Sequence, residues 1–280
     1  MSALLVAIAF ALAPRAVAAV RTQTASAPAA AWPKLDKTRA DEVREKIVSL
    51  KRTLSADGVE TMSARIVEYG KGAVPILYES LARANAEETE RCLRPLERLV
   101  DEGDGARLAA DCASKAAPVR VFALRKAAEM KAAEALPAAR KALADREEDV
   151  RLEAALACSS LGTTDGLEVL RAAARERWPQ LGKRIRTALE RHRSEEATKL
   201  LVPGLGSKDW KESCASLRLL AGVGMKSAAP DVARLLDSED NRVKEDAINA
   251  LRGMIDGERP IEKLSAFDLA EQANAWKKRV

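Results

Sequence analysis

A short phrase recurs in this chain at the spacing of a structural repeat. Val119-Arg120-x-x-Ala123 returns as Val150-Arg151-x-x-Ala154, thirty-one residues later. The stretch 118–162, which holds both copies, reads as helix, turn, helix, turn and helix, because its apolar residues recur at intervals of three and four. Self-similarity at a period of roughly 20 to 50 residues is typical of an array of helix pairs rather than of a single globular core.

Composition favours an all-α fold. Apolar residues make up 47% of the 280 residues, but aromatic residues only 3%. Small apolar side chains let helices approach closely, whereas strands favour β-branched and aromatic residues at alternate positions, and no sustained run of that kind occurs. The 47 basic and 42 acidic residues give a net charge of +5. Such a near balance of the two charges is typical of a solvated helix surface that carries both signs.

The N-terminus resembles a secretory signal peptide. An apolar run from Ala3 to Ala13 is followed by the small-residue site Ala16-Val17-Ala18-Ala19, and the run is too short to span a membrane. We therefore predict residues 1–19 to be a signal peptide cleaved near Ala18 or Ala19, which places the mature chain in the periplasm or outside the cell with no membrane span. Because no Lys or Arg precedes the run, a misassigned start codon or an uncleaved anchor stays as the alternative.

The chain after the cleavage site divides into a leader and a helical array. Residues 20–37 are rich in Ala, Ser, Thr and Pro without periodicity and are predicted to be a flexible leader. Residues 38–280 are predicted to form helix pairs, ending in a capping helix at 265–278. The unit at 178–206 is irregular. The first helices of the clearest pairs are expected to begin near Val119, Val150, Ile185, Trp210 and Val243.

The four cysteines show no metal-binding spacing. Positions four and eight residues after each start lie on one helix face, and this places Cys158 and Cys214 in the core as buried thiols. Cys92 and Cys112 lie on neighbouring predicted helices, and they are a candidate disulfide in an oxidising compartment.

These phrases resemble HEAT repeats. Asp149-Val150-Arg151, with Leu161-Gly162 at the end of the same helix, matches the pattern of that family, and Val243-Lys244 with Leu251 repeats part of it. The segment from Ile66 to Leu77 is similar to the lyase-like HEAT units of exported bacterial proteins, and the resemblance spans roughly residues 55–257. It implies a right-handed α-solenoid of the armadillo type, whose second helices line a concave surface, and a scaffold that binds protein partners.

The sequence offers little for catalysis. The single histidine, His192, excludes a multi-histidine zinc site and leaves no Ser-His-Asp arrangement, and no Gly-rich phosphate-binding motif occurs. We interpret His192 as a solvated residue at a helix end. The sequence therefore predicts no catalytic residue, no metal and no cofactor, and a protein that is not an enzyme, with a lyase-like HEAT enzyme as the minor alternative.

The best candidate site is a basic cluster at 171–193. Arginine beside tryptophan is frequent at protein interfaces, and a basic groove with a stacking ring also suits nucleic acid. We expect a protein partner with an anionic surface, or an anionic polysaccharide. Nucleic acid is the alternative, which requires that the N-terminus is not cleaved. The alternative is that the cluster has no binding role, the tryptophan packing over an irregular turn and the arginines being ordinary solvent-exposed residues. The candidate residues are Arg175, Arg177, Trp178, Lys183, Arg184, Arg186, Arg191 and Arg193.

Overall fold

A computed structural model describes residues 31–190 and 192–280. The predicted signal peptide, most of the predicted leader and Arg191 lie outside the described residues. Fourteen α-helices and no β-strand occur in the described part, so the all-α prediction is confirmed. The helices are α1 Lys37–Arg52, α2 Ala56–Val67, α3 Val74–Leu81, α4 Ala86–Leu99, α5 Gly105–Asp111, α6 Ala117–Met130, α7 Leu136–Ala142, α8 Glu148–Ser160, α9 Leu167–Leu189, α10 Glu195–Leu201, α11 Trp210–Val223, α12 Ala229–Ala233, α13 Asn241–Leu251 and α14 Ala266–Lys277.

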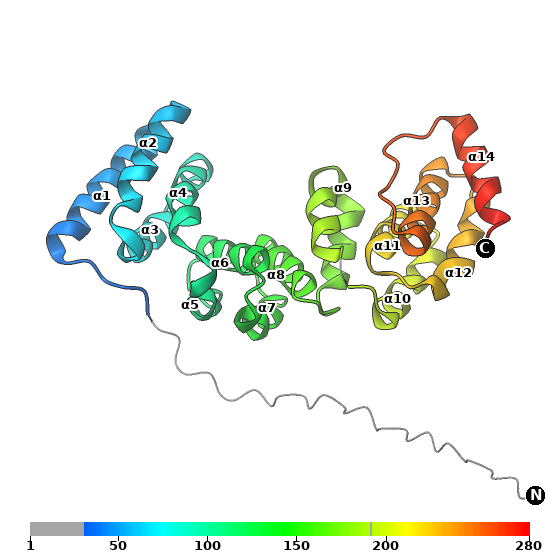
Figure 1. Cartoon of the computed structure of the whole chain (residues 1–280), viewed down its shortest axis with the longest axis horizontal. Helices are drawn as coiled ribbons and strands as arrows, with labels where there is room; N and C mark the ends of the chain where they lie inside the picture. Colours follow the sequence, from blue (N-terminus) through cyan, green and yellow to red (C-terminus); the bar gives the residue numbers. More distant parts are fainter. Residues whose placement is uncertain (1–30, 191) are drawn as a thin grey trace, which may run out of the picture.

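The helices form a two-layered solenoid (Figure 1). One layer holds the long first helices of the pairs, and α6, α8, α9, α11 and α13 pack on one another in that order. The other layer holds the short second helices α5, α7, α10 and α12. Because each helix pair contacts mainly the next pair, the chain is a stack of repeats, which confirms the predicted α-solenoid.

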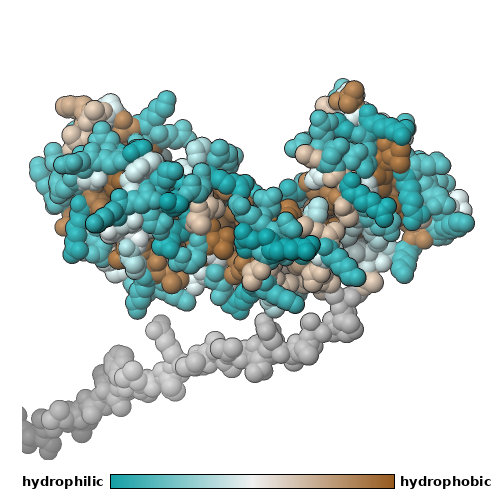
Figure 2. Space-filling view, turned by 180° about the vertical axis from the view of Figure 1, so that it is seen from behind, coloured by the Kyte–Doolittle hydropathy of each residue, from teal (hydrophilic) through white to brown (hydrophobic). Residues whose placement is uncertain are grey.

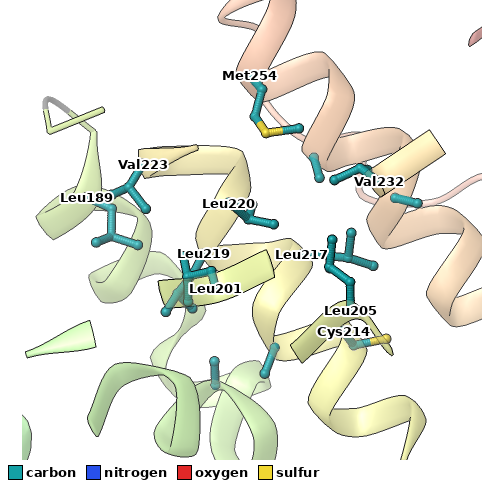
Figure 3. Close-up of a cluster of buried hydrophobic side chains, with 14 of the residues drawn as sticks. Leu189, Leu201, Leu205, Cys214, Leu217, Leu219, Leu220, Val223, Val232 and Met254 are labelled. Carbon is teal, nitrogen blue, oxygen red and sulfur yellow. The ribbon is translucent and has the colours of Figure 1, made fainter. Parts of the chain in front are cut away.

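Small residues let the first helices pack closely, as the stripe in the sequence predicts. Ala123 and Ala127 on α6 and Ala154 on α8 are fully buried. Cys158 and Cys214 are also fully buried, so their interpretation as core thiols is confirmed. Figure 3 shows Cys214 within a cluster of leucine and valine side chains from successive repeats.

The third repeat begins at a different residue from the one predicted. The helix α9 contains a break at Arg177 (φ −129°, ψ 26°), which separates a second helix of one pair from the first helix of the next. Pro179 accounts for a break at this place, because it has no N–H to bond the carbonyl of Arg175 and its ring clashes with that carbonyl in a continuous helix. The first helix of this repeat therefore starts at Trp178 rather than near Ile185. Its inward stripe is Leu181, Ile185 and Leu189, all buried.

The two ends of the array differ. At the C-terminal end, α14 begins with a capping box between Ser265 and Asp268 and packs against α13. At the N-terminal end, Trp32 and Leu35 precede α1 and pack against the core under α1–α8. No helix in the two described ranges is long and apolar enough to cross a membrane.

Candidate protein-interaction surface

The arginine of the repeated Val-Arg phrase is structural. The guanidinium of Arg120 donates to the carbonyl oxygens of Ser114 (2.9 Å) and Lys115 (3.2 Å), and Arg151 donates to those of Asp145 (2.8 Å) and Arg146 (3.0 Å). Each arginine thus satisfies carbonyl groups in the turn that follows the preceding second helix. The phrase recurs because each repeat must tie its first helix to the turn before it.

The arginines at the start of the basic cluster bind the next repeat. Arg175 pairs with Asp209, the N-cap of α11, at 2.7 Å, and Arg171 pairs with Glu212 in the first turn of α11 at 3.0 Å. Arg175 also pairs with the neighbouring Glu176. The hydrogen bond to Arg175 is the main cause that lowers the pKa of Asp209 below its ordinary value. Both arginines therefore stabilise the stacking of α9 on α11.

Two further arginines bind the preceding repeat. Arg177, at the break in α9, pairs with Glu148 at 3.1 Å and lies 3.9 Å from Asp149, both in the first turn of α8. Arg184 makes two hydrogen bonds, of 2.9 and 2.7 Å, to the buried carboxylate of Glu153. Both bonds come from the single nitrogen Nη2, which bridges the two oxygens, so Arg184 cannot turn to a partner without leaving the buried Glu153 carboxylate unpaired.

Trp178 packs over its own helix. Its indole ring lies against Gly182, where an added Cβ would come within 2.9 Å of the ring. The guanidinium carbons of Arg186 and Arg218 lie 5.4 and 5.0 Å from the ring centroid, and Arg218 comes from α11. The half-buried ring therefore fills the contact between two repeats.

The remaining members of the cluster lie apart from this arrangement. Arg193 donates to the carbonyl oxygens of Met254 and Gly253 near the end of the α13 repeat. Lys183 is exposed and has no acidic partner among the described residues. The structure thus brings together Arg175, Arg177, Trp178, Arg184 and Arg186 as contacts between repeats, and they do not form an open basic patch. Arg191 is outside the described residues.

His192 does not lie free in solvent as interpreted from the sequence. It is half-buried, and its ring packs on Gly162, whose φ of +86° ends the α8 repeat in a left-handed turn. No group of acidic, histidine or cysteine side chains in the described ranges is arranged to hold a metal ion.

The candidate disulfide is absent, because Cys92 and Cys112 are free, buried thiols. The Sγ atom of Cys92 lies 3.8 Å from the Ser80 hydroxyl, between α3 and α4, whereas Cys112 ends α5, which packs on α6. Burial raises the pKa of both thiols, that of Cys112 to about 12. The two cysteines therefore occupy separate packing sites.

A groove of about 440 Å³ lies where the stacking of first helices is interrupted. The helices α4 and α6 make little or no close contact, whereas each first helix from α6 onward packs on the next. Figure 2 shows the surface hollowed between the two ends of the molecule, where α6 and α8 lie in Figure 1. The floor is apolar and consists of Leu93, Pro118, Val121 and Phe122.

Charged residues also line the groove. Arg125 pairs with Glu97 at 2.6 Å. The start of α8 contributes Glu147, Glu148 and Asp149, and Arg177 lines the groove as well. Arg177 pairs with Glu148 and lies 3.9 Å from Asp149, and Arg146 pairs with Glu147 at 3.3 Å, so the three acids outnumber their two basic partners by one. All lining helices belong to the first-helix layer, in contrast to the second-helix surface that the resemblance implies.

Sequence reasoning missed this groove, because its floor residues read as ordinary core positions of α4 and α6. The acidic turn 101–105 lies within the third pair, where it joins α4 to α5, so it does not mark the place where α4 and α6 part.

Part of the chain is similar to a known family. Residues 105–190, from α5 to the end of α9, match the family model described as HEAT repeats. No curated protein matches the chain. Among solved structures, one engineered protein is 17% identical, with 86% of this chain and 79% of that chain covered and a TM-score of 0.47. A second engineered protein is 19% identical, with 80% and 92% covered and a TM-score of 0.33.

The class of protein that follows is an all-α solenoid of stacked helix pairs. The match of residues 105–190 to the HEAT-repeat model confirms the resemblance in that part of the array. The same alternation of long and short helices continues through α13.

Proposed function

We propose that this protein is a non-catalytic scaffold of the HEAT-repeat type, exported to the periplasm or secreted after cleavage near Ala18 or Ala19. HEAT repeats generally mediate protein interactions, and the groove between α4, α6 and α8 is the surface that supports this role best. The observation that carries the proposal is the half-buried apolar side chains of Leu93 and Val121, which line the groove at a place where the first helices part. A partner segment that covers this floor gains the free energy of apolar burial without unfolding any repeat.

The groove favours a different partner chemistry from the basic cluster. The prediction of an anionic partner, and the nucleic-acid alternative, both required free cations at 171–193. Most of the described cations there pair with carboxylates or stack on Trp178, so neither partner retains much support from them. The acidic first turn of α8 instead suits a protein segment with apolar side chains and a basic residue beside them.

Substitution in the groove tests the proposal. A partner is first captured from an envelope extract with the wild-type chain, identified by mass spectrometry and purified. Its affinity is then measured for Val121→Arg, which fills the groove floor, and for Val48→Arg, an exposed position on α1 that serves as the matched control. We expect the affinity for the partner to fall at least tenfold in Val121→Arg and to change little in Val48→Arg. Equal affinities for the two variants would refute the groove as the binding site.

Export is tested separately. Mass analysis of the mature chain is expected to show an N-terminus at residue 19 or 20. An intact N-terminal segment on the purified protein would contradict cleavage. It would also restore the condition that the nucleic-acid alternative requires. A mobility shift with DNA that disappears at high salt would then support that alternative.

A further inference from the structure

The segment immediately before α1 occupies a built site on the second-helix layer. The indole Nε1 of Trp32 donates to Oδ2 of Asp111 at 2.8 Å, and the hydroxyl of Tyr78 donates to the same oxygen at 2.9 Å. Trp32 meets Tyr78 edge to face, with ring centroids 6.4 Å apart and planes at 88°. The guanidinium carbon of Arg107 lies 5.3 Å from the centroid of the Trp32 ring. Side chains of two helices, Tyr78 on α3 and Arg107 and Asp111 on α5, therefore converge on Trp32.

Asp111 makes this site selective for an aromatic ring that carries an N–H. Burial raises the pKa of its carboxyl, while the hydrogen bonds from Trp32 and Tyr78 act in the opposite direction and stabilise the charged form. A phenylalanine in place of Trp32 would leave the half-buried oxygen with one donor fewer. Sites built to satisfy a polar group discriminate strongly against a ligand that lacks the matching group.

A second contact fixes what must follow the tryptophan. The side chain of Leu35 lies on Gly72, where an added Cβ would come within 2.7 Å of Cδ2 and 2.9 Å of Cγ of Leu35. Gly72 therefore leaves a space that an aliphatic side chain three residues after the tryptophan fills. The two contacts together select a short extended segment of the form Trp-x-x-Leu.

Side chains alone hold this segment. Among the described residues, the backbone of 31–35 makes no hydrogen bond to the rest of the chain. A segment held by two side chains can leave without breaking secondary structure, so another segment with the same pair can replace it.

We propose that this face of α3 and α5 is a recognition site for a Trp-x-x-Leu segment, filled in cis by residues 32–35 and opened to a partner protein that carries the same pair. The intramolecular segment competes at an effective concentration on the order of millimolar, because its linker to α1 is short. Its test changes Trp32, Leu35 and Gly72, none of which lines the groove, so it can fail while the groove proposal stands.

The experiment uses the mature chain and a synthetic peptide. The probe is the peptide of residues 31–39, AWPKLDKTR, with a fluorescent label at its C-terminus, and binding is measured by anisotropy. We expect Trp32→Ala, which opens the half of the site beside Asp111, to bind the peptide at least ten times more tightly than the wild-type chain. A peptide with phenylalanine in place of tryptophan is expected to bind Trp32→Ala at least ten times more weakly. Adding Gly72→Ala to Trp32→Ala is expected to weaken peptide binding while circular dichroism stays unchanged.

Several outcomes overturn the proposal. One is a folded Trp32→Ala variant that binds no peptide, or that binds it no better than the wild-type chain does. Another is equal affinity for the tryptophan and phenylalanine peptides. If Trp32→Ala does not fold, Leu35→Ala keeps the indole hydrogen bond and opens only the Gly72 half of the site. It should bind the peptide more tightly than the wild-type chain, and equal binding contradicts the proposal.

Discussion

Replacing Arg120 by alanine should destabilise the array more than the same change at Arg151. The Arg120 side chain is 10% exposed and also pairs with Asp145 at 2.8 Å, whose side chain is 15% exposed. Truncation therefore removes two hydrogen bonds to turn carbonyls and leaves a carboxylate with little solvent and without its cation. Breaking a buried pair by removing one partner costs about 3 to 5 kcal/mol. Because Asp145 keeps a hydrogen bond from the backbone N–H of Glu147, we expect the lower part of that range, about 3 kcal/mol.

Arg151 provides the matched control. It makes the equivalent pair of hydrogen bonds to turn carbonyls, but among the described residues it has no carboxylate partner. Its replacement by alanine should cost about 1 kcal/mol, the typical net value of such hydrogen bonds. Urea unfolding followed by circular dichroism compares the two variants, with Arg120→Lys expected to lie between them because an ammonium cannot make the same forked contact. Equal costs for Arg120→Ala and Arg151→Ala would show that the ion pair to Asp145 contributes nothing.

Three further predictions concern buried groups. Burial raises the pKa of Asp246 to about 6, above its unfolded value, so the folded state binds the proton more tightly. Stability relative to Asp246→Asn should therefore rise by about 1 kcal/mol as the pH falls from 7.5 to 5, and a flat or opposite difference contradicts this assignment. Gly166→Ala places a Cβ 2.6 Å from the Cα of Ala155, a backbone atom that cannot move aside, and should cost about 1 to 3 kcal/mol. Gly206→Ala meets nothing within 4 Å and is the control. The four thiols should resist Ellman's reagent in the folded protein and react with it after unfolding. They belong to Cys92, Cys112, Cys158 and Cys214. Reaction of only two thiols after unfolding would reveal a disulfide.

The helix layer and its core stripe could be predicted from the sequence, because each depends on spacing within one helix. Val119, Ala123 and Ala127 are buried as their four-residue spacing predicts. The prediction placed the start of the third repeat too late along the chain. Leu181 is the residue equivalent to Val119 and Val150, and Ile185, four residues later, is equivalent to Ala123 and Ala154. The signal for the correct start was Pro179, since proline also occupies the first turn of α3, α6, α7 and α12.

The role of the basic cluster could not be predicted from a count of charges in one window. Several of the acids that pair with it lie about one repeat away along the chain. Glu148 is 29 residues from Arg177, and Glu153 is 31 residues from Arg184. In a solenoid, positions one period apart are neighbours in space, so a local excess of arginine is matched by carboxylates of the adjacent repeats. The same rule accounts for Asp209, which lies 34 residues from Arg175. For an array of this kind, a basic stretch predicts an open cationic surface only where the segments one repeat before and one repeat after lack acids on the facing side. By that criterion the cluster offers Lys183, an exposed cation with no acidic partner among the described residues, and the interruption between α4 and α6 is the stronger candidate for recognition.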